Sequence, residues 1–77
     1  MEEDMATQTL DCKGLKSPHP VLQVRLTATR LKAGDLIEVV ADCATFEKDL
    51  RDYCAQAKRT LLWIRQEGTA QRAQVKL

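Results

Sequence analysis

The first half of the chain predicts a strand followed by a helix. Over 7–11, threonines alternate with other side chains, which is typical of a short strand. A loop that contains Gly14 follows. Over 18–31, apolar residues recur at the spacing that places them on one face of a helix: Val21, Val24, Ala28 and Leu31.

The second half predicts a strand, a helix and two further strands. Over 35–41 the chain is β-branched and mostly apolar, which is typical of a buried central strand. Residues 60–66 are rich in Leu, Trp and Ile, and 72–77 alternate between apolar and polar, so both predict strands. The short turn between them contains Gly68, which favours a hairpin. Over 45–58, one helical face is apolar: Phe46, Leu50, Tyr53, Cys54 and Ala57.

The predicted order is therefore β-α-β-α-β-β, an α+β fold. We expect a two-layer sandwich in which two helices pack on one face of a four-stranded mixed sheet. The other sheet face is a candidate docking or self-association surface, although a solvated face is the commoner case. With 77 residues and no linker, the chain favours a single domain over 1–77, with residues 1–6 frayed.

Composition narrows the function classes. The net charge is only +1, which argues against strong non-specific binding of nucleic acid. No apolar run approaches the ~20 residues of a membrane span. The first residues are acidic and polar, unlike a signal peptide, so we expect a cytoplasmic protein. The three cysteines are far apart and only one histidine is present, so we expect no metal site, no disulfide and no cofactor.

The start of the first helix has a distinctive sequence, LKSPHP. Pro18 suits the first helical position, where its missing N–H costs nothing. Ser17 is then expected to be the N-cap, its hydroxyl accepting from a free backbone N–H. Pro20 is tolerated because it still lies in the first turn.

The stretch LDCKGLKSPHPVLQVR resembles the signature of the TusA/SirA family of small sulfur-carrier proteins. That signature is Leu-Asp-x-x-Gly-x-x-Cys-Pro-x-Pro, followed by an apolar helix. The similarity extends in order to about Gln66, and the length and element order also fit. Five residues match the signature position for position: Leu10, Asp11, Gly14, Pro18 and Pro20.

The resemblance implies a sulfur-relay function centred on position 17. The family's cysteine, which falls on Ser17, takes sulfur from a donor persulfide, often on a cysteine desulfurase, and passes it to an acceptor protein. It thus implies a donor and an acceptor protein as partners, and a monomer that exchanges them. A helix N-terminus suits this chemistry because its dipole lowers the pKa of a thiol, and Lys16 adds a positive charge.

Serine at position 17 keeps a helix cap but cannot hold a persulfide, so we expect this chain to be inactive in sulfur transfer. Two interpretations stay open. Ser17 is either an engineered replacement, which the intact motif around it favours, or native to a non-catalytic partner-binding or regulatory module. An RNA-binding domain ranks last, because the open sheet face lacks paired aromatic residues.

The neighbours of Ser17 have secondary roles in this interpretation. Asp11 and Gly14 are expected to shape the loop, with Gly14 at positive φ. Lys16, His19 and Arg25 are candidates for partner binding, although solvated surface positions explain them as well.

Two cysteines are candidate surrogate thiols. The ends of parallel strands joined by a helix meet at one edge of a sheet, so Cys12 and Cys43 are expected near Ser17. Burial is the commoner role for such cysteines, and Cys43 is the better candidate of the two. Cys54, on the helix face, is expected in the core.

Overall fold

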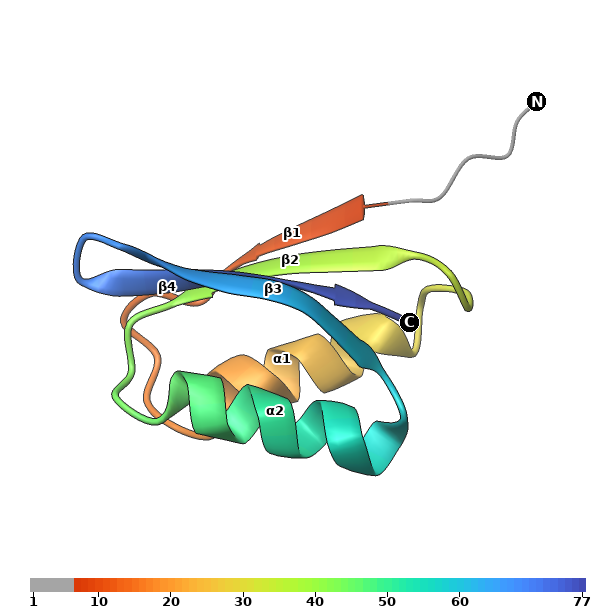
Figure 1. Ribbon diagram of the computed structural model, residues 1–77, viewed down its shortest axis with the longest axis horizontal. Helices are drawn as coiled ribbons and strands as arrows, with labels where there is room; N and C mark the ends of the chain where they lie inside the picture. The colour runs from red at the N-terminus through yellow and green to blue at the C-terminus, as the bar shows by residue number, and fades with distance from the viewer. Residues whose placement is uncertain (1–6) are drawn as a thin grey trace.

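The computed structural model describes residues 7–77, which form a four-stranded sheet with both helices on one face (Figure 1). Residues 1–6, with the frayed terminus expected there, lie outside the described residues. The elements in chain order are β1 (Thr7–Asp11), α1 (His19–Ala28), β2 (Leu36–Ala41), α2 (Phe46–Ala57), β3 (Thr60–Glu67) and β4 (Ala70–Lys76).

The sheet is mixed, with strand order β1-β2-β4-β3. β1 pairs with β2 in parallel, and β4 pairs antiparallel with both β2 and β3. The predicted α+β sandwich and its element order are therefore confirmed. The hairpin between β3 and β4 is also confirmed, and it turns at Gly68, whose φ is 62°.

Helix α1 ends at Ala28 rather than at the predicted residue 31. The Thr29 hydroxyl donates to the Leu26 carbonyl at 2.7 Å, competing with the regular helical bonds. The next amides, of Arg30 and Leu31, bond to carbonyls three residues back, as in a tighter turn. Leu31 still packs against the core, which explains why its spacing looked helical.

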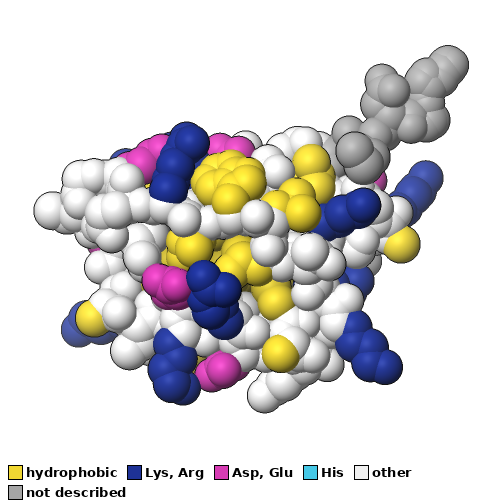
Figure 2. Space-filling view, viewed as in Figure 1, with side chains coloured by type: hydrophobic (Ala, Val, Ile, Leu, Met, Phe, Trp, Pro, Cys, Tyr) yellow, Lys and Arg dark blue, Asp and Glu magenta, His cyan; other side chains and the backbone are white. Residues whose placement is uncertain are grey.

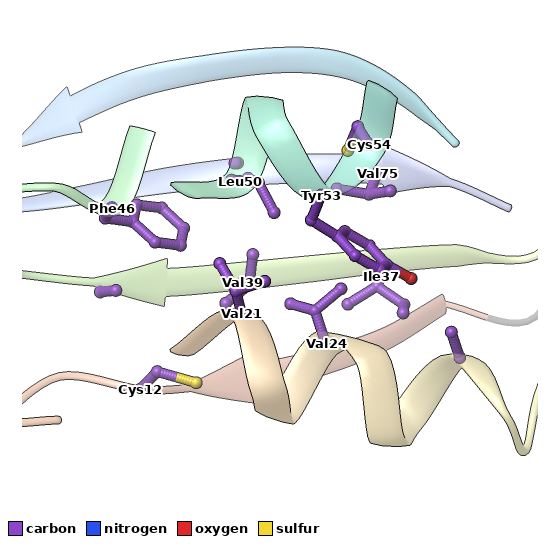
Figure 3. Packing of buried hydrophobic residues seen from close by; sticks show 13 residues of the cluster. Cys12, Val21, Val24, Ile37, Val39, Phe46, Leu50, Tyr53, Cys54 and Val75 are labelled. Atoms are coloured by element: carbon purple, nitrogen blue, oxygen red, sulfur yellow. The ribbon is translucent and has the colours of Figure 1, made fainter. Parts of the chain in front are cut away.

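The core lies between the sheet and the two helices (Figure 3). Both helices and the two central strands supply wholly buried side chains: Val24, Ile37, Val39, Phe46, Leu50 and Val75. Cys54 is buried beside them, as predicted. Along the β3 edge the core is less covered, because Leu61 and Ile64 are only partly buried, and Figure 2 shows apolar side chains between this edge and α2.

The sheet face opposite the helices carries a network of charges. Arg72 bonds both Glu38, at 2.8 Å, and Glu67, at 2.9 Å. The bond from Arg72, with a smaller contribution from Arg65, holds the pKa of Glu67 below its usual value. Arg65 also lies over the Trp63 ring, 4.8 Å from its centroid. This face is therefore polar, and its aromatic ring stacks on arginine.

Candidate functional site

Ser17 lies exposed at the entrance to α1, but it does not cap the helix. The N-cap residue is Pro18, no side chain bonds the helix end, and the Pro18 carbonyl accepts from the Leu22 amide at 3.1 Å. The predictions of Ser17 as N-cap and Pro18 as first helical residue are therefore wrong by one position. Pro20 lies in the first turn as predicted, with its side chain buried.

The Ser17 hydroxyl bonds elsewhere because a stronger acceptor is in reach. It donates to carboxylate oxygen Oδ2 of Asp49, which lies on α2 and 32 residues further along the chain. The Thr45 hydroxyl donates to the same oxygen at 2.9 Å. A charged acceptor binds a hydroxyl more strongly than a neutral group does. Ser17, Thr45 and Asp49 thus form one hydrogen-bonded cluster, the hydroxyl–carboxylate cluster, that ties the start of α1 to α2.

Two other aspartates hold the loop that presents Ser17. Asp11 accepts from the Lys13 amide at 3.1 Å, and Asp42 accepts from the Gly14 amide at 3.0 Å. Gly14 has a φ of 86°, the positive value predicted for it. Because Asp42 follows β2, this bond joins the loop after β1 to the loop after β2.

The two loops meet around a shallow depression of about 610 Å³. This is the juxtaposition expected from the ends of parallel strands. The first loop contributes Ser17 and Lys16, and the second contributes Cys43. The full lining is Gly14, Leu15, Lys16, Ser17, Asp42, Cys43, Ala44 and Thr45.

Cys43 is the thiol that shares this depression with Ser17, and it is half-buried. Burial raises the pKa of its thiol, and the Asp49 carboxylate raises it further. Backbone amides of Thr45 and of Cys43 itself act in the opposite direction without reversing the shift. Cys43 is therefore mainly protonated at neutral pH.

Cys12 is the less accessible candidate, with 2% of its surface exposed. Burial, and next the Asp11 carboxylate, raise the pKa of its thiol. It belongs to the core cluster, and Figure 3 shows it at the end of β1 with its sulfur directed toward α1. Cys12 therefore has the buried position that is commoner for such cysteines, whereas Cys43 is only half-buried.

The predicted partner-binding residues lie at the entrance to α1 and along the helix. Lys16 lines the depression, His19 opens α1, and Arg25 lies over the Tyr53 ring, 5.2 Å from its centroid. All three are exposed, and the sequence has no acidic residue over 12–34. Leucines on the same segment are exposed too: Leu15, Leu22 and Leu26.

Sequence reasoning missed Asp49. Thr45 is the N-cap residue of α2, but its hydroxyl donates to Asp49 and makes no capping bond. Asp49 stands on the polar side of an amphipathic helix pattern, where an aspartate normally faces solvent. Nothing local in the sequence indicates its contact with Ser17.

Two classes of site are not found in the described part of the chain. Within residues 7–77, no group of three or more His, Cys, Asp or Glu side chains could hold a metal ion. None of the helices there is long and apolar enough to cross a membrane.

Comparison with known proteins decides the family. The model of the family described as Sulfurtransferase TusA matches residues 8–76, nearly the whole chain. The chain belongs to the TusA family. Its resemblance to TusA/SirA proteins, first carried by Leu10 to Pro20, is thereby confirmed.

The fold is shared with a solved structure. The crystal structure of the SirA-like protein from Desulfitobacterium hafniense matches with a TM-score of 0.78 and 17% identity. The match covers 88% of this chain and 93% of that one. At this identity the likeness supports the TusA-type fold, and the chemistry of position 17 has to be argued from the residues themselves.

Proposed function

We propose that this chain is a sulfur-relay protein whose transfer site is position 17, and that serine there keeps it from carrying sulfur. With cysteine at position 17, the protein takes sulfane sulfur from a donor protein, such as a cysteine desulfurase, and relays it to an acceptor. It works as a cytoplasmic monomer, without a cofactor, and does not bind nucleic acid directly.

The observation that carries this proposal is the place of Ser17. It is exposed at the entrance to α1, on a loop held by Asp11 and Asp42, where large partners can reach it. The dipole of the α1 N-terminus favours a thiolate there. A serine oxygen, in contrast, cannot hold sulfane sulfur.

The transfer step is a thiol exchange at position 17. The thiolate introduced by Ser17→Cys attacks the outer sulfur of the donor persulfide. The donor's S–S bond breaks, its thiolate leaves, and a new S–S bond forms at position 17. No oxidant or reductant is consumed.

Intact-mass measurement tests the proposal. The chain and its Ser17→Cys variant are incubated with a cysteine desulfurase, cysteine and pyridoxal phosphate for the desulfurase. Only Ser17→Cys is expected to gain about 32 Da, one sulfur atom. Equal gains in both proteins, or no gain in either, would contradict it.

A second function is favoured by the hydroxyl–carboxylate cluster. Ser17 is already bonded to Asp49, so a serine is well accommodated in this site. Such a chain suits a non-catalytic module that occupies partners through exposed residues at and along α1: Lys16, His19 and Arg25.

Competition separates the two functions. A partner-binding module with Ser17 is expected to inhibit sulfur loading of Ser17→Cys by the desulfurase, because both proteins dock on the same site. Arg25→Glu in the inhibitor is expected to weaken that inhibition. Absence of inhibition at a large excess of the Ser17 chain would rule out the binding module for this donor.

A further inference from the structure

Asp49 is the charged group in direct contact with residue 17. Its Oδ2 accepts the Ser17 hydroxyl, and the same oxygen accepts the Thr45 hydroxyl at 2.9 Å. Asp49 is itself half-buried on α2, one helical turn beyond Thr45. Two hydroxyl donors, one from each of the two loops, therefore fix the carboxylate in place against position 17.

The charge around position 17 is mixed. Asp42 and Lys16 line the same depression, on opposite loops. Asp42 is already bonded to the Gly14 amide, whereas Asp49 is bonded to the side chain at position 17 itself. Besides Asp49, the two loops and the start of α1 carry these titratable groups: Asp11, Cys12, Lys13, Lys16, His19, Asp42 and Cys43.

Two effects oppose each other at this site. The N-terminus of α1 stabilises negative charge on residue 17, while a carboxylate at hydrogen-bond distance opposes it. The dipole effect is spread over the first turn, whereas the carboxylate is in contact. A like charge in contact is expected to prevail, because Coulomb energy falls with distance.

We propose that Asp49 is a positioning residue that binds the side chain of residue 17 in its protonated form and restrains its reactivity until a partner displaces that contact. The inference deepens the proposed function, on which it rests for the role of position 17. Asp49 also acts on Cys43, whose thiol pKa it raises. One carboxylate thus restrains both sulfur positions of the depression.

Alkylation by iodoacetamide tests the inference without any sulfur donor. In Ser17→Cys, the pH midpoint of alkylation at position 17 is expected at or above about 8.5, the value of a free cysteine. Adding Asp49→Asn is expected to lower that midpoint by about one pH unit and to speed alkylation at pH 7 about tenfold. Peptide mass mapping assigns each rate to its cysteine.

The matched control is Asp52→Asn in the same Ser17→Cys background. Asp52 lies on α2 as well, but it pairs with exposed Lys48 at 3.1 Å, outside the depression. Asp52→Asn removes the same charge from the same helix, and it is expected to leave the pH midpoint of alkylation at position 17 unchanged. If Asp49→Asn and Asp52→Asn behave alike, Asp49 has no special action on residue 17 and the inference is overturned.

Two further readouts keep the inference open to refutation. If Asp49→Asn does not fold, the pH midpoint of alkylation in Ser17→Cys alone decides whether Asp49 restrains position 17. A midpoint well below about 8.5 overturns the inference, because the helix dipole then outweighs the carboxylate. In the chain with Ser17, Asp49→Asn is also expected to speed alkylation of Cys43. Because no donor is used, failure here is distinguishable from failure of the sulfur-relay proposal, which is judged by mass gain.

Discussion

The hydroxyl of Ser17 donates to the carboxylate of Asp49, joining the entrance of α1 to the first turn of α2 across 32 residues of sequence. The contact holds the exposed loop around position 17 against α2. It also places a negative charge beside the position that we propose for sulfur transfer.

This contact predicts a measurable coupling between the two residues. Ser17→Ala is expected to lower the free energy of unfolding by about 0.5–1 kcal/mol, because one hydrogen bond is lost and Thr45 still bonds Asp49. In a double-mutant cycle by urea denaturation, Ser17→Ala and Asp49→Asn are expected to be less than additive. Strictly additive effects would show that the contact does not form in solution.

Shortening the buried side chain of Phe46 is expected to lower the free energy of unfolding strongly. Its ring is fully buried between α2 and the sheet, so Phe46→Ala is expected to cost about 3–5 kcal/mol, enough to leave so small a domain marginal. The control is Leu26→Ala on α1, whose side chain is 57% exposed and whose loss is expected within about 0.5 kcal/mol. Urea denaturation measures both, and similar costs would contradict the packing described.

Replacing Gly14 is expected to lower stability through the backbone conformation and not through packing. A Cβ at this position would meet nothing within 4 Å, so the cost of Gly14→Ala comes from its φ of 86° alone. We expect a loss of about 1–2 kcal/mol, seen as a lower melting temperature, and a smaller loss for Gly14→Asn, because asparagine tolerates this conformation better. Equal losses for the two variants would refute this explanation.

Glu67, on the open sheet face, is expected to contribute to stability in a pH-dependent way. Its pKa is lowered in the folded state by Arg72 and Arg65, so its stabilising effect is present above about pH 4.5, its ordinary value, and is lost as pH falls through the lowered pKa. The difference in stability between the chain and Glu67→Gln is expected to shrink over that acidic range. A difference that stays constant down to pH 2 would exclude the ionised pair as its source.

Much of the fold was predictable because its signals are local. Alternation over β4 and helical spacing over α2 reflect which side chains meet the core, and Phe46, Leu50 and Cys54 are buried as that spacing required. The end of α1 was not predictable in this way. Leu31 keeps the apolar spacing although the Thr29 hydroxyl has already ended the helix.

The candidate site was predictable in its outline and not in its contacts. Strand order brought the loop of Ser17 beside that of Cys43, as parallel pairing requires. The bond from Ser17 to Asp49 depends on how α1 and α2 pack, and no sequence period reports that. The sequence therefore predicted a helix cap at Ser17, whereas in the folded chain the Ser17 hydroxyl donates to the Asp49 carboxylate.

Whether position 17 accepts the sulfur is decided by locating the sulfur after transfer. After exposure to a loaded cysteine desulfurase, Ser17→Cys is alkylated to block exchange, digested with trypsin and mapped by mass. Trypsin places position 17, Cys12, Cys43 and Cys54 on four separate peptides, so each site is read independently. We expect an added sulfur, about 32 Da, on the peptide 17–25 and none on that peptide in the chain with Ser17. Sulfur found on Cys43 or Cys12 instead, with the peptide 17–25 unmodified, would contradict it.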